Sequence, residues 1–167
     1  MKRATLPLLV AVLCLAGCGG EDPELIQQRS KYLLPEEPTG AVGIVDAKQQ
    51  LADSEGEIVL TAKVGAGEHE TWEDGKAVFA VSEIVEDEPG HGGDGHDPST
   101  CPFCKRRQSL IDTRAIVQVV DDQGEVVGLD ARKLLKLSLN QHVVVRGRGK
   151  IDSLGNLVLS ADGVYVK

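Results

Sequence analysis

The stretch that decides the fold is QHVVVRGRGK at residues 141–150, followed by the turn SLGN at 153–156 and by LVLSADGVYV at 157–166. Val143 and Val145 occupy alternate positions in the first segment, as expected for a strand with one buried face. Glycine and asparagine between two apolar segments are typical of a tight turn. The pattern therefore predicts a β-hairpin that closes the chain.

Several further strands precede this hairpin. In the clearest of them, Ile58, Leu60, Ala62 and Val64 share one face. Asp130 is placed to cap a short helix just before the hairpin. In order, the predicted elements are strands at 57–64, 76–84, 115–120 and 125–128, a helix at 131–137, and strands at 141–150 and 157–166. The protein is therefore expected to be mainly β, with one short helix.

This order of elements, from residue 57 to residue 166, resembles the OB fold, a five-stranded barrel with a helix between its third and fourth strands. The resemblance is one of pattern and implies an OB-like barrel as the scaffold. Two threadings are open. Either residues 85–112 join the second and third strands of the barrel, or the segment 76–84 is an extra strand that extends the first hairpin.

The long insertion at residues 85–112 is acidic at its start and rich in glycine. Its centre reads HGGDGHDPSTCPFC and contains His91, His96, Cys101 and Cys104. Two thiolates and two imidazoles form a ligand set that suits tetrahedral zinc, with cuprous ion as the second choice. The spacing predicts a closed, structural metal site with no open position for catalysis.

Two aspartates lie in the same run. Asp94 and Asp97 are candidates for carboxylates that accept hydrogen bonds from the two histidines, or for substitute ligands. A disulfide between Cys101 and Cys104 is the leading alternative to the metal site, because disulfides persist in an exported compartment. Cys-Pro-Phe-Cys also resembles the glutaredoxin and thioredoxin active-site motif, which would imply thiol–disulfide exchange. That motif belongs to a βαβ unit, which the pattern here lacks.

The N-terminus has the pattern of a secretory signal. Lys2 and Arg3 precede an apolar run at residues 8–15 that is too short for a confident spanning helix. Leu15-Ala16-Gly17-Cys18 closely resembles the lipobox of bacterial lipoproteins. The resemblance implies cleavage before Cys18, lipidation of its sulfur, and attachment to a membrane of the cell envelope, facing the periplasm or the exterior.

These patterns divide the chain into a signal peptide at 1–17, an anchor and tether at 18–40, and a barrel domain at 41–167 that carries the insertion at 85–112. Asp22 and Pro23 could begin a short helix within the tether, through residue 33. A second short helix is possible at 41–52, with Val42, Val45 and Leu51 on one side.

Charge argues against nucleic acid as a partner. Removal of residues 1–17 takes away two of the 18 basic residues and none of the 26 acidic ones, which leaves a formal charge of −10. Such a surface repels phosphate backbones, and aromatic residues for base stacking make up only 3% of the chain. A basic row at Arg146, Arg148 and Lys150 is more typical of one solvated strand face. His69 and His142 are expected to be exposed, and Trp72 to be a packing or turn residue.

The sequence as a whole resembles uncharacterised bacterial lipoproteins that combine such a barrel with a His/Cys-rich loop, a resemblance that implies no established activity. The resulting hypothesis is a non-catalytic, lipid-anchored envelope protein with a transition-metal loop. The alternative is a disulfide-stapled adaptor that contacts a protein partner in the envelope.

Overall fold

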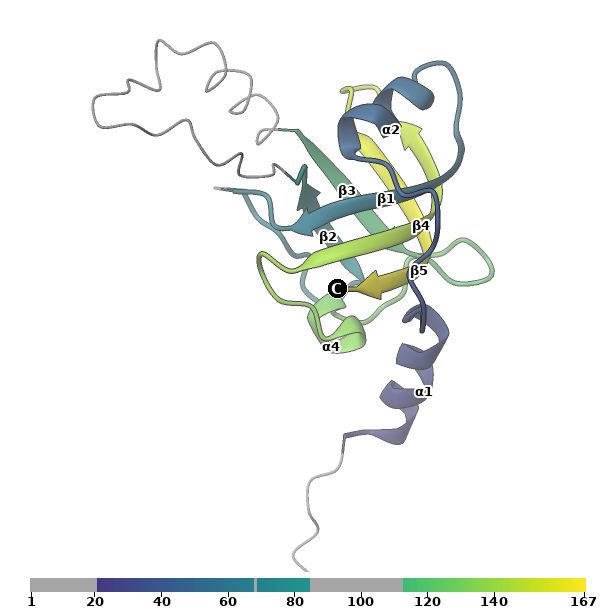
Figure 1. The fold of residues 1–167 in the computed structure, drawn as a ribbon. Helices are drawn as coiled ribbons and strands as arrows, with labels where there is room; N and C mark the ends of the chain where they lie inside the picture. The colour runs from purple at the N-terminus through teal and green to yellow at the C-terminus, as the bar shows by residue number, and fades with distance from the viewer. Residues whose placement is uncertain (1–20, 68, 85–112) are drawn as a thin grey trace, which may run out of the picture.

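The computed structural model describes residues 21–67, 69–84 and 113–167, which form a closed five-stranded barrel with three helices around it (Figure 1). The strands follow one another around the barrel in the order β1-β2-β3-β5-β4, so that β4 returns to pair with β1. The elements are α1 (Pro23–Tyr32), α2 (Ile44–Gln50), β1 (Gly56–Val64), β2 (Val78–Ser82), β3 (Arg114–Val119), α4 (Ala131–Leu135), β4 (His142–Ile151) and β5 (Leu157–Val166). The predicted mainly β, OB-like barrel is thereby confirmed.

The C-terminal hairpin forms as predicted and occupies the centre of the fold. β4 and β5 are antiparallel from Val143↔Val166 to Ile151↔Leu157, with a register shift between Arg146 and Gly147. β5 also pairs in parallel with β3, and β4 pairs with β1. These two strands therefore connect β1 to β3 and close the barrel.

Period-two alternation accounts for the burial of the strands. In β1 the side chains of Ile58, Leu60, Ala62 and Val64 are buried, while the intervening ones are partly or fully exposed. The side chains of β2 are buried on both faces except for the half-buried Ala80, which agrees with the expected strand between two layers. Apolar residues of all five strands, together with residues from the helices, form one core.

The insertion connects β2 to β3, because these two strands pair with each other and no barrel strand is left over. The first of the two threadings is therefore correct. The predicted strand at 125–128 is wrong. The segment forms only an isolated bridge, Val120↔Val126, with a backbone hydrogen bond from Val127 N to Val119 O at 3.0 Å.

The two helices with a predicted aspartate cap, α1 and α4, begin where that cap predicts, whereas α2 begins at Ile44, three residues later than predicted. The Asp22 carboxylate accepts the Glu24 amide at 2.9 Å, and Pro23 opens α1. In α2 the buried face is Ile44, Ala47 and Leu51, with Val42 outside the helix.

The face predicted for α2 was wrong because Val42 lies outside the helix. Its amide donates to Val59 O at 2.9 Å, and Thr61 N donates to its carbonyl at 2.9 Å. Residue 42 is thus held in an extended bridge beside β1, and Val45 is only half-buried. Tertiary pairing here prevails over a local helical pattern.

Helix α1, within the segment predicted as tether, is packed against the barrel. The Arg29 guanidinium donates to Leu134 O at 2.9 Å and to Lys133 O at 2.7 Å, and thereby binds the last carbonyls of α4. Tyr32 is buried, and the amide of Leu34 donates to Val164 O at 2.9 Å. Helix α1 is therefore part of the folded unit. No helix in the described part of the chain is long and apolar enough to span a membrane.

Candidate functional site

The residues predicted to carry the chemistry lie outside the described part of the chain. This applies to Cys18 and to the set His91, Asp94, His96, Asp97, Cys101 and Cys104. Within residues 21–67, 69–84 and 113–167, no group of three or more His, Cys, Asp or Glu side chains is placed to hold a metal ion. The two histidines in that part of the chain, His69 and His142, are exposed as expected.

The structure does place the two points at which the insertion leaves the barrel. Ser82, the last residue of β2, is in register with Arg114, the first residue of β3. One step further out, the amide of Glu83 donates to Thr113 O at 3.1 Å. The two ends of the insertion are therefore side by side, as in an extended hairpin.

Glu83 also fixes this point of departure to a helix. Its carboxylate accepts the amide of Val45 at 3.0 Å, in the first turn of α2. A negative charge at a helix N-terminus satisfies a free amide and complements the helix dipole. Gly43, the N-cap residue of α2, lies so close to the Glu83 carboxylate that a side chain there would displace it. The base of the insertion is consequently held by both a strand pair and a helix cap.

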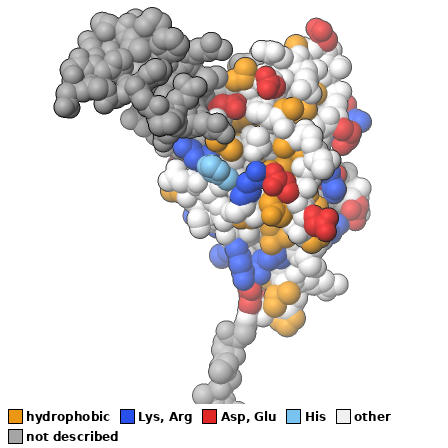
Figure 2. All heavy atoms as spheres, viewed as in Figure 1, with side chains coloured by type: hydrophobic (Ala, Val, Ile, Leu, Met, Phe, Trp, Pro, Cys, Tyr) orange, Lys and Arg blue, Asp and Glu red, His pale blue; other side chains and the backbone are white. Residues whose placement is uncertain are grey.

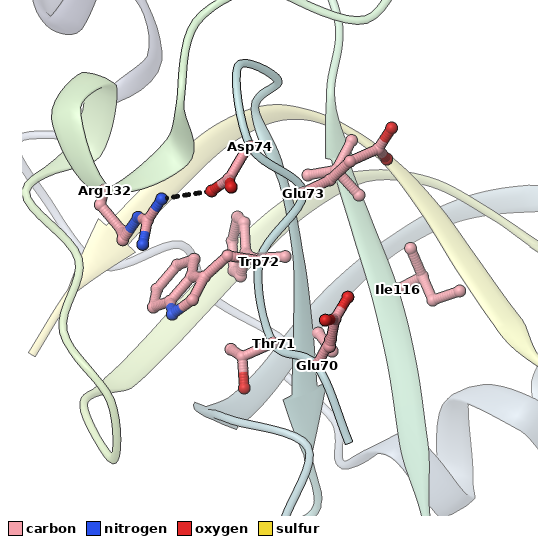
Figure 3. A pocket seen from close by; sticks show the side chains of 10 residues that line it. Glu70, Thr71, Trp72, Glu73, Asp74, Ile116 and Arg132 are labelled. Carbon is pink, nitrogen blue, oxygen red and sulfur yellow. Dashed lines mark hydrogen bonds and ion pairs between the residues drawn. The ribbon is translucent and has the colours of Figure 1, made fainter.

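A groove of about 600 Å³ lies on the outer face of β2 and β3 (Figure 3). It is formed where the β1–β2 connection folds back beside β2, with Ala80 N donating to Thr71 O at 2.7 Å. Glu70, Thr71, Trp72, Glu73, Asp74, Val78, Phe79, Ala80, Ile116 and Arg132 line the groove.

Trp72 packs between an aromatic ring and a cation. Its ring centroid is 6.2 Å from that of Phe79, with the planes tilted by 37°, and the Arg132 guanidinium carbon lies 5.7 Å from the Trp72 centroid. Phe79 is 1% exposed and belongs to the core, so Trp72 continues the core outward to the surface. This arrangement agrees with the expected packing role of Trp72.

The charged groups beside Trp72 are paired. The Asp130 carboxylate accepts both the backbone amide and Nε of Arg132 at 2.9 Å, and the other end of the guanidinium contacts Asp74 at 2.7 Å. Hydrogen bonding to Arg132 lowers the pKa of Asp130 to about 2, and the Asp130 carboxylate raises the pKa of Arg132. Through Asp74 and Asp130, the Arg132 guanidinium links the start of α4 to the β1–β2 connection.

A second hollow of about 380 Å³ adjoins the groove and shares Glu70, Ala80 and Ile116 with it. Its remaining lining includes Arg114, at the point where the insertion returns to the barrel. The sequence did not predict these hollows, because a loop that folds back over a sheet leaves no periodic signal. A tryptophan within an acidic turn was the one local indication of a packed loop.

The basic row on β4 is largely neutralised by neighbouring carboxylates. Arg146 Nε contacts Asp162 at 2.7 Å, and Arg148 lies 3.2 Å from Glu55 and 3.5 Å from Glu57. All of these side chains are substantially exposed, so the pairs contribute little to stability. Their arrangement is that of a solvated strand face, as the sequence indicated.

No protein-family model matches the sequence, and no curated protein matches it.

Proposed function

We propose that this protein is a lipid-anchored envelope protein whose β2–β3 insertion binds one transition-metal ion, with zinc as the first choice and copper as the second. His91, His96, Cys101 and Cys104 are the proposed ligands. The observation that carries the proposal is that all four lie within a stretch of fourteen residues, in a segment rich in glycine. Such a set can surround one ion without help from the rest of the chain.

The proposed role is structural rather than catalytic. Two thiolates and two imidazoles fill a tetrahedral coordination shell, which leaves no position for water or substrate. Asp94 and Asp97 are proposed to accept hydrogen bonds from the ligating histidines and so fix their orientation. A bound ion would supply the free energy needed to order a segment that is rich in glycine.

The barrel supports this proposal as a scaffold. The strand pair Ser82↔Arg114 brings the two ends of the insertion together, and Glu83 links that base to α2. A segment whose ends are already adjacent has less conformational entropy to lose when an ion closes it. The insertion can therefore adopt a metal-bound form without rearrangement of the core.

The direct test is metal analysis of the chain from residue 19, purified without chelator. That chain retains two cysteines, Cys101 and Cys104, so its thiol count has a simple interpretation. We expect one equivalent of zinc or copper per chain, and two thiols that react with a thiol reagent only after a chelator is added. Metal content is measured by mass spectrometry and thiols by absorbance.

Matched variants make the test specific. His91→Gln, His96→Gln, Cys101→Ser and Cys104→Ser are each expected to reduce the bound metal at least about tenfold. His69→Gln and His142→Gln remove exposed histidines outside the insertion and should leave the metal content unchanged. Metal-free protein whose two thiols appear only after reduction would favour a disulfide-stapled adaptor. Metal-free protein with two freely reactive thiols would rule out both the metal site and the disulfide.

The anchor has its own test. In the full-length chain produced in bacteria, Cys18 should incorporate labelled fatty acid, and the protein should sediment with membranes. Cys18→Ala should abolish both results without changing the metal content. Equal membrane association of the two chains would contradict the lipid anchor.

A further inference from the structure

The N-terminal end of the described chain is attached to one particular end of the barrel. Glu21 contacts Arg29 Nη2 at 2.6 Å and Lys136 Nζ at 3.1 Å, just after the last turn of α4. Hydrogen bonds from Arg29 and Lys136 lower the pKa of Glu21 to about 2, so its carboxylate remains ionised near neutral pH. Arg29 is itself only 8% exposed and binds the carbonyls of Lys133 and Leu134.

This attachment makes the connection to the proposed anchor very short. Only Gly19 and Gly20 lie between Cys18 and Glu21. Three successive Cα steps span at most about 11 Å, even when fully extended. A lipidated Cys18 would therefore hold Glu21 within about that distance of the lipid headgroups. Lys136, just after α4, is joined to Glu21 by an ion pair, so the α4 end of the barrel would lie near the headgroups as well.

The insertion leaves the barrel at the opposite end. β3 begins at Arg114 beside Ser82. Helix α4 follows the other end of β3, and Glu21 contacts Lys136 there (Figure 1). An end held against the membrane therefore leaves the base of the insertion directed away from it.

We infer that the barrel end formed by α4 and the start of α1 rests at the phospholipid headgroups of the membrane that holds the anchor, so that the insertion is presented away from the bilayer. This inference rests on the proposed lipidation of Cys18. It adds to that proposal a defined contact surface and a defined orientation, where a free tether from residue 18 to residue 40 would allow all orientations.

The short connection, rather than charge, holds this orientation. Basic side chains gather beside the point where the chain leaves the barrel toward its N-terminus (Figure 2). The exposed Lys133 and Lys136 of this region are offset by Glu21, Asp22 and Glu24. We therefore expect the same orientation on neutral phosphatidylcholine vesicles as on vesicles that contain an anionic phospholipid.

The native tryptophan provides the measurement. Trp72 is the only tryptophan of the chain, and it lies near α4, beneath the Arg132 guanidinium. The lipidated full-length protein is reconstituted in phosphatidylcholine vesicles that contain a dansyl-labelled headgroup lipid. Energy transfer from Trp72 to dansyl then reports the distance from this end of the barrel to the membrane, and flotation of the vesicles reports anchoring.

An inserted linker tests the orientation without disturbing the fold. Twenty Gly/Ser residues between Gly20 and Glu21 add a mean span of about 25 Å, which should lower energy transfer several-fold while the protein still floats. The same linker placed in the exposed turn at residues 153–155 should leave transfer unchanged. A chain with Trp72→Phe and Asp46→Trp moves the reporter to α2, at the far end of the barrel, and should show several-fold lower transfer than the native chain.

The possible results distinguish a failure of the inferred orientation from a failure of the proposed lipid anchor. Flotation with equal transfer in the native chain and in the chain extended after Gly20 would overturn the orientation and leave the anchor intact. A native chain that does not float would overturn the anchor, and the orientation with it.

Discussion

Two of the antiparallel hairpins of the barrel, β4–β5 and β2–β3, have connections of very different length. β4 and β5 are joined by a tight turn, in which the Asp152 carboxylate accepts the amides of Leu154 and Asn156 at 2.8 Å. β2 and β3 are joined instead by the residues from Glu83 to Thr113. The first hairpin shows what folding alone requires, which is a short connection stabilised by local hydrogen bonds. The second connection is far longer than a hairpin requires, which agrees with the proposal that it carries the metal ligands.

The two hairpins also differ in the chemistry of their connecting residues. The β4–β5 turn contains Asp152, Ser153, Leu154, Gly155 and Asn156, whose types suit a turn and little else. The β2–β3 connection contains all four proposed metal ligands. Loops on a rigid scaffold are where binding residues are concentrated in proteins. This contrast adds support to the proposal that the insertion binds the metal ion.

The substitution expected to destabilise the β4–β5 hairpin most strongly is Gly147→Ala. A Cβ at this position would meet the backbone of Ser160 and Ala161 across the β4–β5 pair, where no flexible side chain can move aside. Backbone overlap of this kind should lower the free energy of unfolding by about 3 kcal/mol or more. Urea unfolding followed by Trp72 fluorescence measures the loss.

Gly128→Ala is the matched control, because a Cβ there meets no atom within 4 Å. It should change the free energy of unfolding by less than about 0.5 kcal/mol. A Gly147→Ala variant as stable as this control would mean that β4 and β5 can separate locally without cost, contrary to their central position.

A smaller effect of opposite sign is expected when the second hairpin is given a short turn. Replacing residues 84–112 with Asn-Gly places a two-residue turn between Glu83 and Thr113, whose backbones are already hydrogen bonded. Shorter connections cost less entropy to close, so the metal-free barrel should gain about 1–2 kcal/mol. Urea unfolding in chelator is the measurement, and metal binding should be lost entirely.

The replacement also tests whether the insertion contributes to the core and whether it contains the metal ligands. A barrel that no longer folds without residues 84–112 would show that the insertion contributes to the core. A barrel that folds and still binds zinc would show that the metal ligands lie elsewhere in the chain.

The same contrast explains how much could be predicted from the sequence. Alternation identified β1, β4 and β5, although Val144, on the face of β4 predicted to be outward, is also buried. The caps Asp22 and Asp130 were recognisable, because a carboxylate before a helix has a local role that does not depend on the rest of the fold. Such local rules predicted the β4–β5 hairpin, although not its register shift between Arg146 and Gly147.

Features that depend on distant parts of the chain were not recognised. Arg29 looks like a solvated charge on a helix, but its partners are carbonyls about a hundred residues away in α4. The predicted helix at 131–137 ends early at Leu135, because Lys136 adopts a left-handed conformation with φ 56°. The groove beside Trp72 forms only because the β1–β2 connection folds back beside β2. Contacts of this kind follow from tertiary structure and not from sequence pattern.

The smallest predicted effect concerns the turn of the first hairpin and its dependence on pH. Hydrogen bonds from the Asn156 side chain and from the backbone amides of Asn156 and Leu154 lower the pKa of Asp152 below its usual value. A carboxylate with a lower pKa in the folded state stabilises that state above its unfolded pKa, which is about 3.9, and this stabilisation is lost as the pH falls through the folded value. Asp152→Asn should therefore lower the urea midpoint at pH 7 and make progressively less difference as the pH falls below about 4.

The control is Asp53→Asn, at an exposed carboxylate after α2, which should leave the urea midpoint unchanged at pH 7 and at pH 3. If the difference between the native chain and Asp152→Asn were the same at pH 7 and pH 3, the turn would be held by its backbone geometry and not by the charge of Asp152.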